Sequence, residues 1–226
     1  MEPLCCHHLS LVLCRPADFS LSRTLRSFRP SPSGVRRQCY GRIGDTAGSL
    51  REVIGDALAF QGHSVNTIDD AELSAAAELI NNSWKPNLIK FDAEGFGKSF
   101  ANGDFWACQG YAEVIFKEVA EDKQNEIIDF FIPKEGGPCY LDSLVILKGA
   151  KHYDLAMKFI NFFHRPEIYA EFLDAFRFPG FVNTEANQYR TTIPMYSAEE
   201  MLGCELKNDL GENIEKYIEI WESIRH

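Results

Sequence analysis

The sequence predicts an α/β fold, in which helices pack on a sheet. Apolar runs typical of short strands alternate along the chain with segments whose apolar residues recur every three or four positions, as on one face of a helix. The chain has 226 residues, of which 45% are hydrophobic, and this suffices for one large domain or two small ones.

The first predicted helix begins at Ser49, because Ser49 and Glu52 form a capping box ahead of an apolar stripe. Gly62 is suited to the end of this helix. A second helix is predicted from about Asp70 to Asn81, followed by a break. Three shorter elements are then predicted from local runs: a strand at 85–91, a strand at 104–108 and a helix at 109–121.

A glycine turn separates two further predicted strands, Ile127–Ile132 and Leu141–Leu147. Gly136 and Gly137 lie between them and permit a sharp backbone turn with positive φ. The remaining elements are predicted from helical spacing and capping residues: helices at 153–163 and 166–176, an aromatic turn at 178–182, a short capped helix at 197–203 and a terminal helix at 208–224.

Tyr140 and Asp142 follow the glycine turn directly. On an extended strand, residues two apart lie on the same face. An aromatic ring beside a carboxylate attracts an organic ammonium group, because the π-face and the negative charge both favour a cation. The sequence therefore predicts a site for a small organic cation here.

Composition excludes several other functions. The net charge of −10 argues against nucleic acid as a partner and is compatible with small cations. The apolar runs are far shorter than the roughly 20 residues of a transmembrane helix. The motifs of nucleotide-binding folds, hydrolases and zinc proteases are missing, and the spacing of the cysteines does not match a structural zinc site. We therefore expect a protein that is not an enzyme and needs no cofactor or metal.

Residues 1–44 differ from the rest of the chain. They hold seven Arg, no Lys and two acidic residues, a net charge of +5, and four of the seven Cys. Three interpretations are open: a disordered basic tail, a degenerate export signal, or translation in a shifted reading frame or from a mis-called gene start, joined to an in-frame remainder near 44–49. We expect no regular structure in this segment.

From Ser49 to the C-terminus the chain resembles the spermidine/putrescine-binding proteins of bacterial polyamine ABC importers. The matching motifs occur in the family's order: S-L-R-E-V-I-G with S-V-N-T, the 106–114 turn, P-K-E-G-G with Y-L-D-S-L, A-M-K-F-I-N-F-F-H-R-P, the 178–183 turn and N-D-L-G. The resemblance implies a fold like that of type II periplasmic binding proteins, with two α/β lobes that close on a polyamine. It also implies a periplasmic location, although no convincing signal peptide is present.

The resemblance implies a set of ligand-binding residues. Asp142 matches the family's central ammonium-binding aspartate, Tyr140 a ligand-stacking tryptophan, Glu52 a glutamate of the second lobe and Phe178 a tyrosine near the ligand. Each of these residues could instead have a purely structural role. Asp142 could be an acid at the end of a strand and Tyr140 a half-buried aromatic on it. Glu52 could cap a helix, and Phe178 could pack in the core.

Departures from the family's pattern add two more candidates. Cys108 replaces a stacking tryptophan, for which Trp106 could substitute from the same strand face. Ser49 replaces an aspartate. Lys207 replaces a glutamine and puts a cation where a cation should bind.

The family is about half again as long as this chain. We therefore expect an N-terminally truncated binding protein, with one fairly complete lobe (45–140 and 187–226) and a remnant of the first lobe (141–186). The expected partners are spermidine or putrescine and an inner-membrane ABC permease, and the expected state is a monomer. Two alternatives remain: a truncated remnant that binds nothing, and a Cys/His hydrolase that uses Cys108 or Cys139 with His152.

Overall fold

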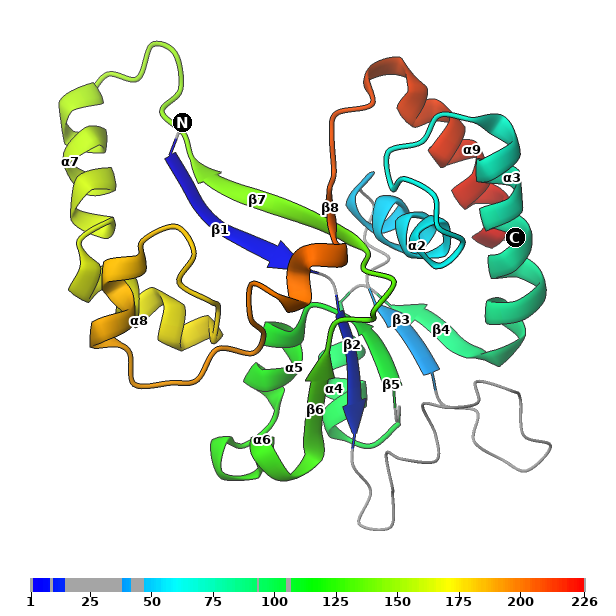
Figure 1. The fold of residues 1–226 in the computed structure, drawn as a ribbon, viewed down its shortest axis with the longest axis horizontal. Helices are drawn as coiled ribbons and strands as arrows, with labels where there is room; N and C mark the ends of the chain where they lie inside the picture. The colour runs from blue at the N-terminus through cyan, green and yellow to red at the C-terminus, as the bar shows by residue number, and fades with distance from the viewer. Residues whose placement is uncertain are drawn as a thin grey trace.

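The computed structural model describes residues 2–8, 10–14, 38–41, 47–92, 94–104 and 107–225. The strands in this part form two sheets (Figure 1). In one sheet β7 lies between an antiparallel and a parallel neighbour, in the order β1 (Glu2–His8), β7 (Pro138–Leu144), β8 (Glu205–Leu206). The other sheet is mixed and has the order β4 (Leu88–Asp92), β3 (Gln38–Gly41), β5 (Ala107–Gly110), β2 (Ser10–Cys14), β6 (Ile128–Phe131).

The helices pack in three groups, each around its own cluster of buried residues (Figure 1). The first group is α2 (Ala47–Phe60), α3 (Asp70–Leu79) and α9 (Ile214–Arg225), which bury side chains such as Ile54, Leu58, Leu73 and Tyr217. The second is α4 (Phe96–Ala101), α5 (Ala112–Glu118) and α6 (Glu121–Ile127), beside β5 and β6. The third is α7 (Tyr153–Phe163), α8 (Pro166–Phe176) and η3 (Thr184–Tyr189).

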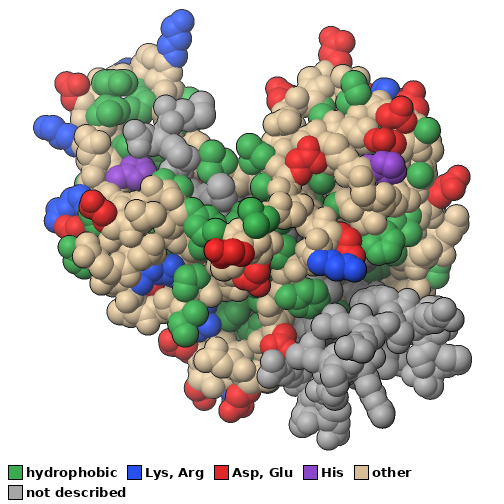
Figure 2. Space-filling view, in the orientation of Figure 1, with side chains coloured by type: hydrophobic (Ala, Val, Ile, Leu, Met, Phe, Trp, Pro, Cys, Tyr) green, Lys and Arg blue, Asp and Glu red, His purple; other side chains and the backbone are tan. Residues whose placement is uncertain are grey.

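A wide hollow separates the third group from the first. Figure 2 shows it between the α7–α8 side of the molecule and the α2–α3–α9 side. In Figure 1, β7 crosses from the first group toward the third beneath this hollow, with β1 alongside. The strand that carries Tyr140 and Asp142 therefore links the two sides.

Three stretches of the N-terminal segment form strands, which differs from the expectation of a segment without regular structure. β1 pairs with β7, and β2 lies between β5 and β6. The apolar run L-V-L-C at 11–14 lies in β2. Backbone pairing with strands far along the chain supplies the order that local sequence did not indicate.

Most predicted elements are present. The bounds predicted for α7 and α8 are confirmed, and Pro166 lies at the first position of α8. The predicted break after α3 is instead a π-helical turn, η1 (Ile80–Trp84), followed by a 3₁₀ turn, η2 (Lys85–Asn87). The strand predicted at 104–108 lies at 107–110, and α4, α6, η3 and β8 were not predicted. The capped helix predicted at 197–203 is the 3₁₀ turn η4 (Glu200–Gly203), and the start of the terminal helix is the 3₁₀ turn η5 (Gly211–Asn213).

The capping-box interpretation of Ser49 and Glu52 is corrected. α2 begins at Ala47, so Ser49 lies inside the helix rather than at its cap. Glu52 is then free to serve another role, because it is not needed to cap the first turn.

The predicted glycine turn is confirmed. Gly136 has a φ of 75°, in the left-handed region. A Cβ atom built on Gly136 would lie 1.7 Å from the carbonyl oxygen of Gly203. The Gly137 carbonyl accepts a hydrogen bond of 3.0 Å from the backbone N–H of Glu205. The turn therefore packs backbone against backbone and positions β8 beside β7.

The Gly136→Ala variant is expected to lower the free energy of unfolding by about 1–3 kcal/mol, through backbone strain and the clash with Gly203. Gly149→Ala is the matched control, because Gly149 also has a positive φ of 89° but no atom within 4 Å of its Cβ position. Urea denaturation of both variants measures the difference. Equal losses in the two variants would contradict the close approach at Gly136.

Candidate functional site

Six polar and aromatic side chains from distant parts of the chain meet beside β7. We call them the Glu52 cluster: Glu52, Asp56, Gln109, Tyr111, Tyr140 and Lys207. α2 supplies two of them, the β5–α5 region two more, and β7 and the residue after β8 one each. The cluster therefore depends on the packing of α2 against both sheets.

An ammonium group already lies at the centre of this cluster. Lys207 Nζ forms an ion pair with Glu52 Oε1 and lies 4.9 Å from the centroid of the Tyr140 ring. The Glu52 side chain is 2% exposed and that of Lys207 is 17% exposed. A carboxylate and a ring face thus act on one cation in a largely buried place, where both attractions are stronger than in water.

Two tyrosines form the aromatic wall. The rings of Tyr111 and Tyr140 meet edge to face, with centroids 5.8 Å apart. The Tyr111 hydroxyl donates a hydrogen bond of 3.4 Å to Glu52 Oε1. Burial, together with the nearby Tyr111, Glu113 and Asp142, raises the pKa of Tyr140 far above its usual value. Tyr140 therefore stays neutral.

Asp56 lies one helical turn after Glu52 on α2 and accepts a hydrogen bond from the Gln109 amide. Burial, and then the charge of Glu52, raise the pKa of Asp56 well above its usual value. Glu52 Oε2 and Gln109 Oε1 are both buried, and no hydrogen-bond donor in the described part of the chain reaches either atom. The cluster thus retains acceptor capacity beside the ammonium of Lys207.

The sequence motifs S-V-N-T and N-D-L-G position Lys207. Arg51 and the backbone N–H of Asn208 both donate to Asn66 Oδ1, at 2.7 and 2.8 Å. The Asn66 amide donates to Glu205 Oε1 at 2.9 Å. The backbone N–H of Lys207 donates to the Cys139 carbonyl at 2.8 Å. The residues on both sides of Lys207 are therefore fixed.

Glu205 contributes to the same network. Its carboxylate accepts hydrogen bonds from the Ser64 hydroxyl at 2.7 Å and the Val65 N–H at 2.8 Å. Burial alone would raise the pKa of Glu205, but these bonds and the one from Asn66 lower it. An ionised Glu205 thus ties β8 to the loop after α2.

The structure brings together three of the six residues predicted from the sequence, namely Glu52, Tyr140 and Lys207. Asp142 lies two residues beyond Tyr140 on β7, and its side chain is exposed. Phe178 lies elsewhere, 3% exposed in the core beside α8. Trp106 lies outside the described residues.

Sequence reasoning missed Asp56, Gln109 and Tyr111. The spacing of Glu52 and Asp56, four residues apart on one helix, was an available signal, because such residues lie on the same face. Gln109 and Tyr111 carry no local signal of this kind.

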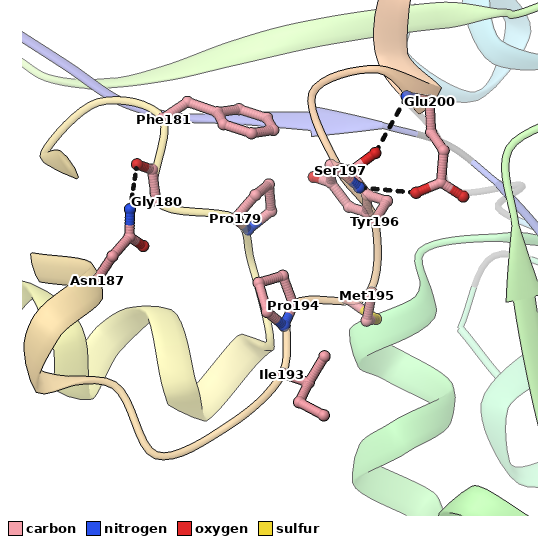
Figure 3. Close-up of a pocket in the computed structure, with 10 residues that line it drawn as sticks. All are labelled: Pro179, Gly180, Phe181, Asn187, Ile193, Pro194, Met195, Tyr196, Ser197 and Glu200. Carbon is pink, nitrogen blue, oxygen red and sulfur yellow. Dashed lines mark hydrogen bonds between the residues drawn. The ribbon is translucent and has the colours of Figure 1, made fainter.

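A separate cavity of about 490 Å³ lies between the 179–187 loop and the 193–200 segment (Figure 3). Its walls include Pro179, Phe181 and Ile193, and it contains none of the predicted site residues. Its carboxylate, Glu200, accepts a hydrogen bond of 2.7 Å from the backbone N–H of Ser197, so it caps a turn. Glu200 is the one carboxylate among the described residues that line this cavity, and it is already engaged in this cap.

The two cysteines and the one histidine of the alternative hydrolase lie on different elements. Cys108 is buried in β5, Cys139 is buried at the start of β7, and His152 is exposed ahead of α7 in the third helix group (Figure 1). Within the described ranges, no group of three potential metal ligands lies together. No helix in that part of the chain has both the length and the apolar character needed to cross a membrane.

Comparison with known proteins confirms the resemblance seen in the sequence. Residues 44–200 match the family of bacterial extracellular solute-binding proteins. The chain is 32% identical over 156 residues to the putrescine-binding periplasmic protein SpuD of Pseudomonas aeruginosa, covering 68% of this chain and 41% of that protein. It is 29% identical over 182 residues to the spermidine/putrescine-binding periplasmic protein of Escherichia coli, covering 77% and 51%.

A solved structure extends the match to nearly the whole chain. The TpPotD lipoprotein of Treponema pallidum is 42% identical, with a TM-score of 0.86 over 98% of this chain and 67% of its own. The chain spans about half or less of the length of the two curated relatives above. The predicted fold class is confirmed, and the chain belongs to the bacterial extracellular solute-binding protein family, with the α/β fold of type II periplasmic binding proteins.

Proposed function

We propose that this chain binds a polyamine, spermidine or putrescine, as the periplasmic substrate-binding component of an ABC importer. The observation that carries the proposal is the Glu52 cluster, which places a buried carboxylate and the face of the Tyr140 ring against an ammonium group, with Tyr111 contacting both Glu52 and Tyr140. A polyamine needs both features, because its ammonium groups require acceptors when desolvated and its methylenes gain from burial against rings. The names of the relatives support the same ligand class.

The hollow beside β7 supports a binding mode between two lobes. We assign residues 45–140 and 187–226 to one lobe and residues 141–186 to the other. The separate core around Tyr169, Leu173 and Phe178 supports this division. Asp142 would then meet the ligand from the strand that joins the lobes, and Glu52 from one lobe.

The chain would act by binding alone, as a monomer that delivers its ligand to an inner-membrane ABC permease. This assignment needs no catalytic residue, cofactor or nucleic acid. The family match supports it, because the family is one of solute-binding proteins.

One observation favours the alternative of a folded chain that binds nothing. Lys207 already occupies the position between Glu52 and Tyr140 that a ligand ammonium would take. Binding measurements separate the two functions directly.

The Asp142→Asn variant tests the proposal. We expect it to weaken polyamine binding by about 1.5–3 kcal/mol, the typical contribution of a hydrogen bond to a charged group. Isothermal titration calorimetry of the full chain with spermidine and with putrescine measures this. Asp122→Asn, at an exposed position on α6, is the matched control and should bind like the wild type. A loss smaller than about 0.5 kcal/mol would remove Asp142 from the site, since it is below the contribution of a typical neutral hydrogen bond.

A further inference from the structure

Lys207 takes up the place that a ligand ammonium would occupy under the proposed function. Its Nζ contacts the Glu52 carboxylate and faces the Tyr140 ring, the two kinds of group that recognise an organic ammonium. We propose that Lys207 is a specificity-determining residue, which fills one ammonium subsite from within the chain and so selects ligands with fewer ammonium groups. This inference rests on the proposed polyamine function.

The position of Lys207 is imposed by the fold. Its own N–H is bonded to Cys139 on β7, and its neighbours Leu206 and Asn208 are both bonded to Asn66. Its side chain is only 17% exposed. The ammonium group therefore acts as a fixed part of the site, at an effective concentration that a free ligand cannot match.

The charge balance explains the selectivity. Glu52 supplies one negative charge, and Lys207 neutralises it through Oε1. Glu52 Oε2 and Gln109 Oε1 are buried and have no donor in the described ranges, so a ligand ammonium would reach them only by displacing the side chains that cover them. It would do so beside a like charge, and two cations that share one carboxylate repel each other. A triamine loses more from this than a diamine, which can place its ammonium groups elsewhere.

The test compares spermidine with putrescine on the full-length wild type and on Lys207→Met, which keeps the length of the side chain and removes its charge. We expect spermidine to bind the variant about tenfold or more tightly than the wild type, because a charge-assisted subsite is released. The affinity for putrescine should change less, so the ratio of the Kd for spermidine to the Kd for putrescine should fall in the variant. Lys207→Gln should change the two affinities in the same direction as Lys207→Met.

Two controls identify the cause. Lys216→Met removes another lysine that is paired with an acid, Asp70, outside the cluster, and should leave both affinities unchanged. In the double variant Glu52→Gln/Lys207→Met the subsite has no charge, so the gain for spermidine should disappear.

The outcomes separate this inference from the proposed function. If the wild type binds polyamines and Lys207→Met changes neither affinity nor their ratio, the role of Lys207 is overturned and the proposed function stands. If neither the wild type nor the Lys207 variants bind either polyamine, the role of Lys207 and the proposed function are both overturned.

Discussion

Lys207→Met is expected to lower the free energy of unfolding by about 3 kcal/mol, because it leaves the buried carboxylate of Glu52 without its cation. This value is at the low end for a buried ion pair, because the Lys207 side chain is still 17% exposed to solvent. Urea denaturation of the full chain, without ligand, measures the change.

The double variant Glu52→Gln/Lys207→Met should recover most of this loss. A neutral amide and a thioether of similar volume replace the two charges, and such replacements of buried ion pairs are often close to neutral. Lys216→Met, which breaks an exposed pair with Asp70, should cost at most about 1 kcal/mol. A single variant as stable as the wild type, or a double variant no more stable than the single, would show that the pair is not buried as described.

Asp174→Ala is expected to have a comparable effect, about 3 kcal/mol or more, because it removes the centre of a hydrogen-bonded network. The carboxylate accepts bonds from Arg190 Nε at 2.9 Å and from the hydroxyls of Thr191 and Thr192 at 2.7 and 2.8 Å. The Arg190 side chain is 5% exposed and also donates to the Phe178 carbonyl. Removing Asp174 leaves this buried guanidinium without its counter-ion.

The same network predicts a dependence of stability on pH. Burial alone would raise the pKa of Asp174, but the bonds from Thr191, Arg190 and Thr192 outweigh it and lower that pKa well below its usual range. Because the folded-state pKa is lowered, the stabilisation is present above the unfolded pKa of about 4 and is lost as the pH falls below it.

Urea denaturation of the wild type and of Asp174→Ala measures both the loss of stability in the variant and its dependence on pH. The measurements run from neutral pH to about pH 3, so that they cross the unfolded pKa of Asp. The wild type should lose more stability on acidification than Asp174→Ala does. Glu171→Ala, at an exposed position on the same helix, should follow the wild type. Parallel curves for the wild type and Asp174→Ala would remove Asp174 as the source of the acid sensitivity.

Local sequence predicted the elements whose signals are local. The start of α8 follows from Pro166, which is favoured at a first helical position, and α7 follows from its apolar periodicity. The glycine turn follows from Gly136, because few other residues adopt its φ. β1 and β2 carry no such signal, since their order comes from pairing with strands more than 90 residues away.

The candidate site was predictable in part for the same reason. Tyr140 and Asp142 could be found because one strand holds both. The ion pair of Glu52 with Lys207 joins residues 155 positions apart, and no local pattern indicates that they meet. Family resemblance singled out Lys207 as a departure, and only the fold shows what that departure does to the charge of the site.

Thermal denaturation of the full chain, with and without spermidine and putrescine, tests the central claim most directly. A ligand that binds only the folded state stabilises it by about 2.7 kcal/mol at a hundred times its Kd, and so raises the Tm. We predict a cooperative transition whose Tm rises with either polyamine, and a smaller rise for Asp142→Asn at the same concentration. A cooperative transition that neither polyamine moves would contradict polyamine binding by this chain.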